Sequence, residues 1–469
     1  MENAPSRSPA HRSNQSLVDL DRRHLIHPVT SFRGHEAHGA RVLESGDGMW
    51  LTDIEGKKVL DAFAGLWCVN VGYGQESIVE VAMEQMRRLP YATGYFHFGS
   101  EPAILLADKL ASLAPEGLDH VYFTLGGSDA VDSAIRYITH YFNAIGKPEK
   151  KQFIALEWGY HGSSSNGAGL TALANFHRGF DLPRPWQHHI ASPYPYRHPE
   201  GHDDAAVIAS TVAAIEAKVA ELGADKVAAF CCEPIQGSGG VIVPPRGWLK
   251  AIRETCDRLG ILMLVDEVIT GFGRTGPMFA CDDEGVSPDF LTLAKGLTSG
   301  YAPMGAVLMA DHVYQSIADS APAALPVGHG FTYSGHPVSA AVGLEVIRLY
   351  ENGLLENGVQ TGKRFDHHLE RIRAHPLVGD TRGRGLLGAI ELVSNKETKA
   401  GFAADLDIAG RLSQLTWDNG VIVRCFANAV IGFAPALCCS ESEMDLIFQR
   451  VERSLDQLLE MPDVRQALG

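Results

Sequence analysis

The chain has 469 residues, of which 45% are hydrophobic and 20% charged, an ordinary composition for a globular protein of roughly two or three domains. Its formal net charge of −16 argues against a general nucleic-acid binder, because an acidic surface repels the phosphate backbone. No run of about 18 apolar residues occurs, so we predict no membrane span.

Short apolar runs alternate with helical stretches along the chain. Within the runs polar and apolar residues do not alternate, which is typical of strands buried on both faces of a sheet. Strand, helix and strand in succession indicate an α/β fold with a mainly parallel central sheet. The predicted strands are His120–Leu125, Gln152–Leu156, Val227–Cys232, Ile261–Val265, Phe290–Ala294 and Ala306–Met309. The predicted helices between them are Asp129–Phe142, Ala205–Glu221 and Trp248–Leu259.

The two ends of the chain have a different pattern. Shorter extended segments such as Val59–Ala62 come before the first long run. After about residue 335 come a helix at Val338–Glu351, strand material at Gly385–Val393 and an amphipathic helix at Glu441–Leu459. We expect a smaller α+β domain built from both termini. The predicted division is a polar, disordered tail without a secretory signal (1–16), the N-terminal part of the small domain (17–65), a large domain (66–335) and the C-terminal part of the small domain (336–469).

The cysteines and histidines predict neither disulfides nor a metal site. Eight cysteines are present, two pairs of them adjacent, and none forms a C-x-x-C motif. This pattern favours buried, reduced thiols in a cytoplasmic protein. His35 and His38 are three residues apart, no H-E-x-x-H motif occurs, and we therefore predict no metal ligands.

Reactive side chains follow several of the predicted strands. Glu233, Asp266 and Lys295 each come directly after an apolar run. Since ligands bind at the carboxyl ends of parallel strands, these three groups are candidates for one site. The loop Gly126–Ser128 follows the first run and opens a helix, where free N–H groups suit a phosphate. A tight turn with Ser128 as an N-cap is the alternative reading of that loop.

Lys295 and Asp266 lie in unusually apolar surroundings for charged residues. Partial burial lowers the pKa of a lysine, so that its neutral amine becomes a nucleophile for carbonyls. A buried carboxylate requires a cationic partner, and a protonated pyridine nitrogen is one. A phosphate loop, a lysine and an aspartate on neighbouring strand ends together match pyridoxal 5'-phosphate.

The same residues carry a resemblance to a known family. From about residue 40 to residue 460 the chain resembles the class III aminotransferases, which have the fold-type I scaffold of pyridoxal phosphate enzymes. The most specific motif is the segment 264–276, Leu-Val-Asp-Glu-Val-Ile-Thr-Gly-Phe-Gly-Arg-Thr-Gly, followed by Ala294-Lys295-Gly296. Supporting motifs are Trp158–Gly162, Glu233–Gly237 and Gly330–Pro337.

This resemblance implies roles for the cofactor-binding residues. Lys295 is implied to form the Schiff base with the cofactor and to move the substrate proton, and Asp266 to hold the pyridinium nitrogen. Tyr160 and Val268 would sandwich the ring, and Gly127 and Ser128 would bind the phosphate. His161 and Glu233 complete the cofactor set, although a purely structural role is open for both. Thr332 would reach the phosphate of a neighbouring subunit, which implies a homodimer or homotetramer.

Within the family, the segment Gly65–Gly74 is similar to the ω-aminotransferases that use pyruvate as acceptor. The similarity implies a primary amine, diamine or ω-amino acid as donor. Trp67, Tyr95 and Tyr160 would contact the donor, and Arg424 would bind the keto-acid carboxylate. A core tryptophan and a surface ion-pair arginine are the alternatives for Trp67 and Arg424. The alternative function is another reaction on the same scaffold, such as that of an aminomutase or a decarboxylating aminotransferase.

Overall fold

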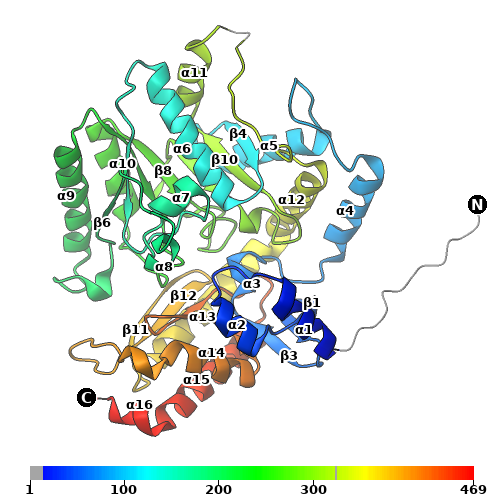
Figure 1. Cartoon of the computed structure of the whole chain (residues 1–469), viewed down its shortest axis with the longest axis vertical. Helices are drawn as coiled ribbons and strands as arrows, with labels where there is room; N and C mark the ends of the chain where they lie inside the picture. The colour runs from blue at the N-terminus through cyan, green and yellow to red at the C-terminus, as the bar shows by residue number, and fades with distance from the viewer. Residues whose placement is uncertain (1–13, 323–324, 469) are drawn as a thin grey trace, which may run out of the picture.

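The computed structural model describes residues 14–322 and 325–468. Figure 1 shows a large part around a central sheet, with a smaller part below it in which the blue N-terminal and the orange and red C-terminal segments meet. Helix α1 begins at Asn14, inside the stretch predicted as a tail, and residues 1–13 of that stretch lie outside the described residues. None of the described helices is long and apolar enough to cross a membrane.

The central sheet has seven strands in the order β4-β10-β9-β8-β7-β5-β6. Strand β10 is antiparallel to both of its neighbours, and all other neighbours are parallel, which confirms a mainly parallel sheet. Every residue of β7, β8 and β9 is buried, as expected for strands covered on both faces. The strands are β4 (His120–Thr124), β5 (Gln152–Leu156), β6 (Gln187–Ile190), β7 (Val227–Cys232), β8 (Leu262–Asp266), β9 (Phe290–Leu293) and β10 (Gly305–Met309).

The helices begin and end at residues with clear capping chemistry. In α9 the Asp203 carboxylate accepts a hydrogen bond from the Ala206 N–H at 3.0 Å. Helix α10 ends at Gly260, whose φ of 60° is left-handed and favours glycine. The longer helices are α1 (Asn14–His24), α4 (Glu76–Arg88), α5 (Glu101–Leu113), α6 (Gly127–Ala144), α9 (Asp204–Leu222), α10 (Trp248–Leu259), α11 (Asp311–Asp319), α12 (Pro337–Leu349), α13 (Leu355–Ile372), α14 (Ile408–Asp418) and α15 (Glu441–Glu460). The short helices are α2 (Phe32–His38), α3 (Ala64–Trp67), α7 (Ser165–Leu170), α8 (Ala174–His177) and α16 (Pro462–Gln466).

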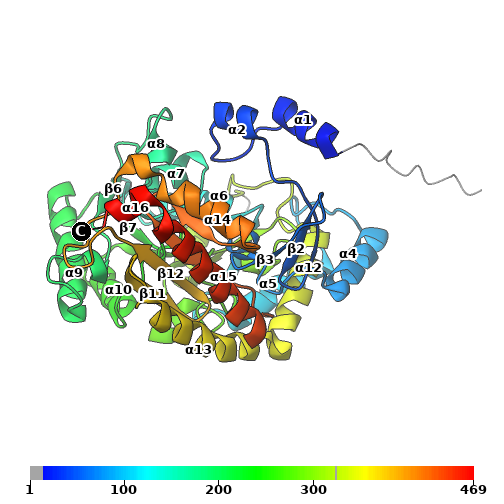
Figure 2. The same ribbon diagram turned by 90° about the horizontal axis from the view of Figure 1, so that it is seen from below.

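Two four-stranded sheets form the smaller part. In the first, β13 (Val421–Ile422) pairs in parallel with β3 (Lys58–Asp61), so the two ends of the chain share one sheet, as predicted. In the second, all neighbours are antiparallel, and α13 packs against its edge strand β11 and against α15 (Figure 2). The other strands are β1 (Leu43–Asp47), β2 (Trp50–Asp53), β11 (Val378–Arg384), β12 (Leu387–Leu392), β14 (Arg424–Phe426) and β15 (Val430–Phe433).

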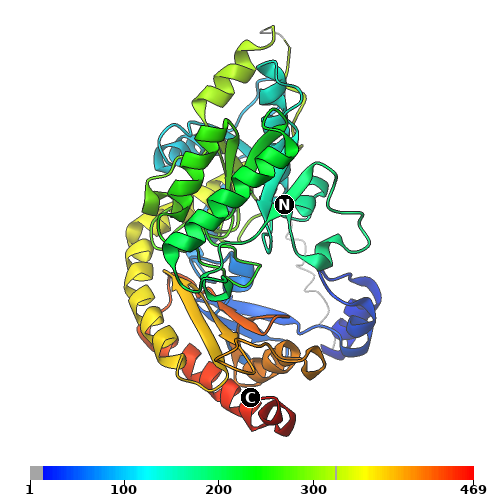
Figure 3. The same ribbon diagram turned by 90° about the vertical axis from the view of Figure 1, so that its left-hand side faces the viewer.

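A pair of helices and a buried arginine help to join the two parts. Helices α12 and α13 follow one another through a π-helical turn and run along one side of the molecule, in yellow in Figure 3. Arg274, from the motif after β8, is fully buried and donates hydrogen bonds to Asn70 Oδ1 at 2.6 Å and to the Pro435 carbonyl at 2.6 Å. Arg274 therefore links the loop after β8 to the N-terminal segment that contains Asn70 and to the C-terminal segment that contains Pro435.

Candidate active site

A cavity of about 450 Å³ lies at the carboxyl ends of β7, β8 and β9, beside the first turn of α6. Ten of the twelve predicted site residues line it. They are Trp67, Gly127, Ser128, Tyr160, His161, Glu233, Asp266, Val268, Lys295 and Arg424.

Lys295 follows β9 and begins the short 3-10 helix Lys295–Leu297. Its backbone has a φ of 45°, a left-handed conformation that a lysine rarely adopts and that is typical of functional sites. Burial lowers the pKa of its amine, while Asp266 and Glu233 raise it by a smaller amount. The Nζ atom lies 5.5 Å from the centre of the Trp67 ring. The surroundings therefore favour a more nucleophilic amine than that of an exposed lysine.

Asp266 ends β8 and is 4% exposed. Its Oδ2 atom lies 3.0 Å from Nδ1 of the fully buried His161, and its Oδ1 atom accepts a hydrogen bond from the Val268 N–H at 3.1 Å. Burial by itself lowers the pKa of His161, but the contacts with Cys231 and Asp266 outweigh it and raise that pKa well above its ordinary value. The pair therefore places a carboxylate, held in position by His161, at the wall of the cavity, where it can accept a hydrogen bond from a cationic N–H group.

Glu233 follows β7 and is also buried. Its two oxygens accept hydrogen bonds from the N–H groups of Tyr160, at 2.9 Å, and Gly237, at 3.0 Å. Burial raises the pKa of this carboxyl to about 7, against the charge of His161, which lowers the pKa, and with a smaller contribution from Asp266, which raises it. Glu233 thus fixes the backbone that carries Tyr160 and lines the cavity as well.

Gly127 and Ser128 occupy the first turn of α6. A Cβ atom on Gly127 would lie 2.9 Å from Cγ1 of Val268, so the close approach of loop and strand requires glycine there. The Ser128 hydroxyl accepts a hydrogen bond from the Ser163 N–H at 3.0 Å. The helix begins at Gly127 with Gly126 in the cap position, so the N-cap alternative for Ser128 is wrong.

Aromatic side chains form the wall opposite these strand ends. Trp67 is 3% exposed, has a left-handed φ of 55°, and contacts Phe63 and Phe426 with ring centres 4.7 and 6.2 Å away. The Arg424 guanidinium lies 5.2 Å from the centre of the Phe426 ring. Among the described residues no carboxylate forms an ion pair with Arg424, so its alternative as an ion-pair arginine has no support.

Tyr95 and Thr332 lie away from this cavity in the single chain. Tyr95 is 40% exposed, with its hydroxyl packed against Gly330. The Thr332 carbonyl accepts a hydrogen bond from the Tyr91 hydroxyl at 3.0 Å. The two residues therefore belong to one exposed surface formed by the segments around residues 91–95 and 330–332.

Several cavity residues were absent from the predicted set. They come from loops and from elements distant in sequence, where no local pattern marks them. One of them, Phe176, packs edge-on against the predicted residue Tyr160, with ring centres 5.2 Å apart. They are Pro28, Val29, Thr30, Leu66, Gly162, Leu173, Phe176, Ser238, Ile269 and Phe426.

The residues present fit pyridoxal phosphate. A buried carboxylate positioned by His161 suits the ring nitrogen, the first turn of α6 suits the phosphate, and Lys295 suits the carbonyl. When bound, the cofactor supplies a carbonyl that joins the amine and a ring that accepts electrons from the substrate carbon.

Comparisons with known proteins agree with this chemistry. The chain is 42% identical over 442 residues to the putrescine–pyruvate aminotransferase of Pseudomonas aeruginosa, covering 93% of this chain and 95% of that protein. It is 35% identical over 455 residues to the diaminobutyrate–2-oxoglutarate transaminase of Halomonas elongata, covering 95% and 97% of the two chains.

Solved structures show the same fold over nearly the whole chain. The (S)-enantioselective ω-transaminase of Thermomicrobium roseum superposes with a TM-score of 0.91 and 39% identity over 95% of this chain and 99% of that one. The ω-transaminase of Pseudomonas jessenii in complex with PMP gives a TM-score of 0.92 and 37% identity over 97% and 99%. The predicted fold-type I scaffold is thereby confirmed.

The family model of class III aminotransferases matches residues 33–455, which include the strand ends and all but three of the residues around the cavity. This protein is therefore a class III aminotransferase, an enzyme that moves an amino group from an amine to a keto acid and uses pyridoxal 5'-phosphate as its cofactor.

Proposed function

We propose that the enzyme transfers an amino group from a primary amine, diamine or ω-amino acid to pyruvate. The observation that carries the proposal is Arg424, a guanidinium that lines the cavity without an acidic partner among the described residues, next to the aromatic wall of Trp67 and Phe426. A planar guanidinium binds a carboxylate in two-point contact. The aromatic wall accepts the uncharged part of a donor amine, so one cavity serves both substrates in turn. The relative that acts on putrescine and pyruvate supports the same pairing.

The roles of the chain's own residues follow from their places. Lys295, with its lowered pKa, takes the proton from the substrate carbon and returns it as general acid. Asp266, positioned by His161, would hold the cationic ring nitrogen of the cofactor. Tyr160 and Val268, which line the same cavity, would enclose the ring, and Ser128 and Gly127 would bind the phosphate.

The test follows the absorbance of the bound cofactor while amines are added without a keto acid. Donor amines should reduce the band of the resting enzyme, and pyruvate should restore it and yield alanine. Lys295→Ala is the control and should show no turnover with any amine. A band that no amine changes would contradict the proposed donors, whereas restoration by 2-oxoglutarate but not by pyruvate would contradict the acceptor.

We further propose that the active form is a homodimer or homotetramer in the cytoplasm. Thr332 lies outside the cavity of its own chain, on a surface with exposed apolar residues such as Phe96, 82% exposed, and Tyr333, 56% exposed. A second copy that covers this surface would place Thr332 and Tyr95 at the neighbouring cavity. The cytoplasmic location is supported by the eight unpaired cysteines.

A further inference from the structure

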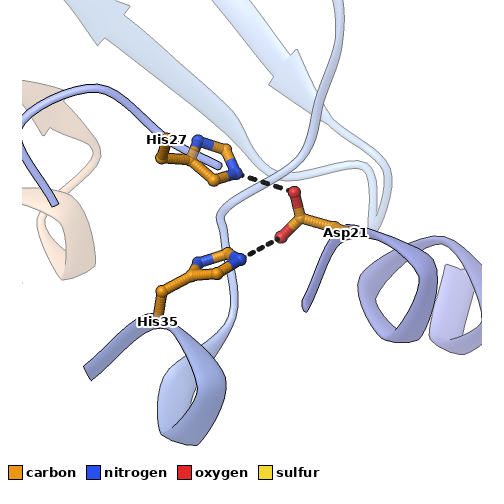
Figure 4. Close-up of side chains that lie close together, drawn as sticks. All are labelled: Asp21, His27 and His35. Carbon is orange, nitrogen blue, oxygen red and sulfur yellow. Dashed lines mark hydrogen bonds and ion pairs between the residues drawn. The ribbon is translucent and has the colours of Figure 1, made fainter. Parts of the chain in front are cut away.

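Two histidines and one aspartate converge near the N-terminus, outside the cofactor cavity. Asp21 lies on α1, His35 lies on α2, and His27 lies in the segment between these helices (Figure 4). The Nε2 atom of His27 is 2.7 Å from Asp21 Oδ1, and that of His35 is 3.2 Å from Asp21 Oδ2. The two imidazole rings lie 4.6 Å apart, and both point their Nε2 atoms at the same carboxylate.

One hydrogen bond, between His27 Nε2 and Asp21 Oδ1 at 2.7 Å, accounts for the first histidine but not for the second. The side chains of Asp21 and His35 are only 10% and 9% exposed. The atoms Asp21 Oδ2 and His35 Nε2 are both buried, and neither has a hydrogen-bond partner among the described residues, although they face each other. The two atoms meet only as an ion pair at 3.2 Å, and buried polar atoms are normally hydrogen-bonded, so the arrangement favours a ligand that both atoms share.

We propose that Asp21, His27 and His35 form a binding site for a divalent transition-metal ion of the zinc class. Imidazole nitrogens and one carboxylate are ligands that Zn²⁺ prefers, and two histidines with one acidic residue leave a fourth position for water. Ligand atoms at about 2.0–2.1 Å from a tetrahedral ion lie about 3.3 Å from one another. The contact between Asp21 and His35 already has this spacing. His27 Nε2 lies 2.7 Å from the other oxygen, Asp21 Oδ1, and the three ligand atoms lie within 4.8 Å of one another, so the more exposed His27 must shift to reach an ion on Oδ2.

The site is joined to the cofactor cavity through the chain itself. Pro28, Val29 and Thr30 directly follow His27 and line that cavity. Val29 has a left-handed φ of 52° and is 70% exposed, so little packing holds this segment in place. An ion that links α1, the segment and α2 would fix this wall of the cavity. The site could not be predicted from the sequence, because Asp21, His27 and His35 are six and eight residues apart, a spacing that matches none of the metal motifs considered above.

The experiment uses the untagged holoenzyme, dialysed against a chelator and titrated with Zn²⁺ in competition with a chromogenic indicator. We expect one site per chain that is weakened at least about 100-fold by His35→Ala and by Asp21→Asn, because each change removes a ligand. His38→Ala is the matched control, since His38 is an exposed histidine on the same helix, and it should bind Zn²⁺ like the unchanged enzyme. Thermal unfolding of each variant without metal shows whether the fold is kept.

A second measurement covers the case in which a core substitution disturbs α1 or α2. His27 is the most exposed of the three ligands, at 29%, so His27→Ala removes a ligand with the smallest loss of packing. Co²⁺ in place of Zn²⁺ should give the visible spectrum of a nitrogen- and oxygen-bound ion, without a thiolate band. Equal Zn²⁺ binding by the unchanged enzyme and by His27→Ala would overturn the proposal, as would no binding at all or a thiolate spectrum.

Discussion

Arg424→Ala should separate the two substrates of the enzyme. Arg424 lines the cavity, rests on the Phe426 ring and forms no ion pair with a described residue. If it binds the acceptor carboxylate, its removal should raise the KM for pyruvate strongly. The KM for an uncharged primary amine should change little, because that substrate offers the guanidinium no anion.

The size of the effect follows from the geometry. A hydrogen bond to a charged group contributes about 1.5–3 kcal/mol, and the exposed position of Arg424 favours the lower value. One such bond corresponds to about a 10-fold change, and two-point contact of about 3 kcal/mol to more than about 100-fold. We therefore expect the KM for pyruvate to rise between about 10- and 100-fold, and the KM for the amine by less than about 3-fold.

The assay measures steady-state kinetics with each substrate varied against a saturating partner. Arg246→Ala removes an arginine that is 70% exposed and outside the cavity, and should leave both KM values unchanged. Arg424→Lys keeps the charge but loses the planar fork, so it should fall between alanine and the unchanged enzyme. Equal increases in KM for pyruvate and for the amine would refute the carboxylate role and indicate a loss of packing on Phe426.

Three further predictions concern the cofactor site. Gly127→Ala should weaken cofactor binding at least about 10-fold in an absorbance titration, since the new Cβ would lie 2.9 Å from Val268. Gly126→Ala is the control and should bind the cofactor normally, because a Cβ at Gly126 would meet no atom within 4 Å. Lys295→Ala and Thr332→Ala should each impair activity when expressed alone, but co-expressed chains should recover part of it if Thr332 serves the partner's site; no recovery would contradict that role. Burial raises the pKa of Glu233 from its ordinary 4.5 to about 7, so the folded state keeps the proton to a higher pH and loses stability relative to the unfolded state as the pH rises through this window. In denaturant titrations of the cofactor-free protein from pH 4.5 to 7.5, Glu233→Gln should remove about 3 kcal/mol of that decline, and parallel curves for the two proteins would contradict the assignment.

The strands of the central sheet could be predicted because their signal is local. Apolar runs in the sequence predicted β5 and β7 with the observed bounds, and predicted both ends of β8 to within one residue. Strand β6 (Gln187–Ile190) was not predicted, because its two adjacent histidines leave it with too few apolar residues. The antiparallel direction of β10 was also not predicted, because apolar composition carries no information on strand direction.

The same distinction divides the site. Glu233, Asp266 and Lys295 each follow a recognisable strand, so general rules about parallel sheets were enough to bring them together. Phe426 and Thr30 line the cavity from β14 and from the N-terminal segment. Their place depends on tertiary contacts between segments distant in sequence, which no local pattern reveals.

This division has a functional consequence. Asp266 and Lys295, the two groups proposed for the cofactor's ring and carbonyl, lie at the ends of buried strands of the central sheet. Other parts of the cavity wall come from surrounding segments that are less tightly packed, such as Val29 with its exposed side chain. Substitutions in these segments can alter the shape of the cavity without moving Lys295 or Asp266. Changes in the range of accepted amines should therefore arise there first, with the chemistry of the strand ends kept intact.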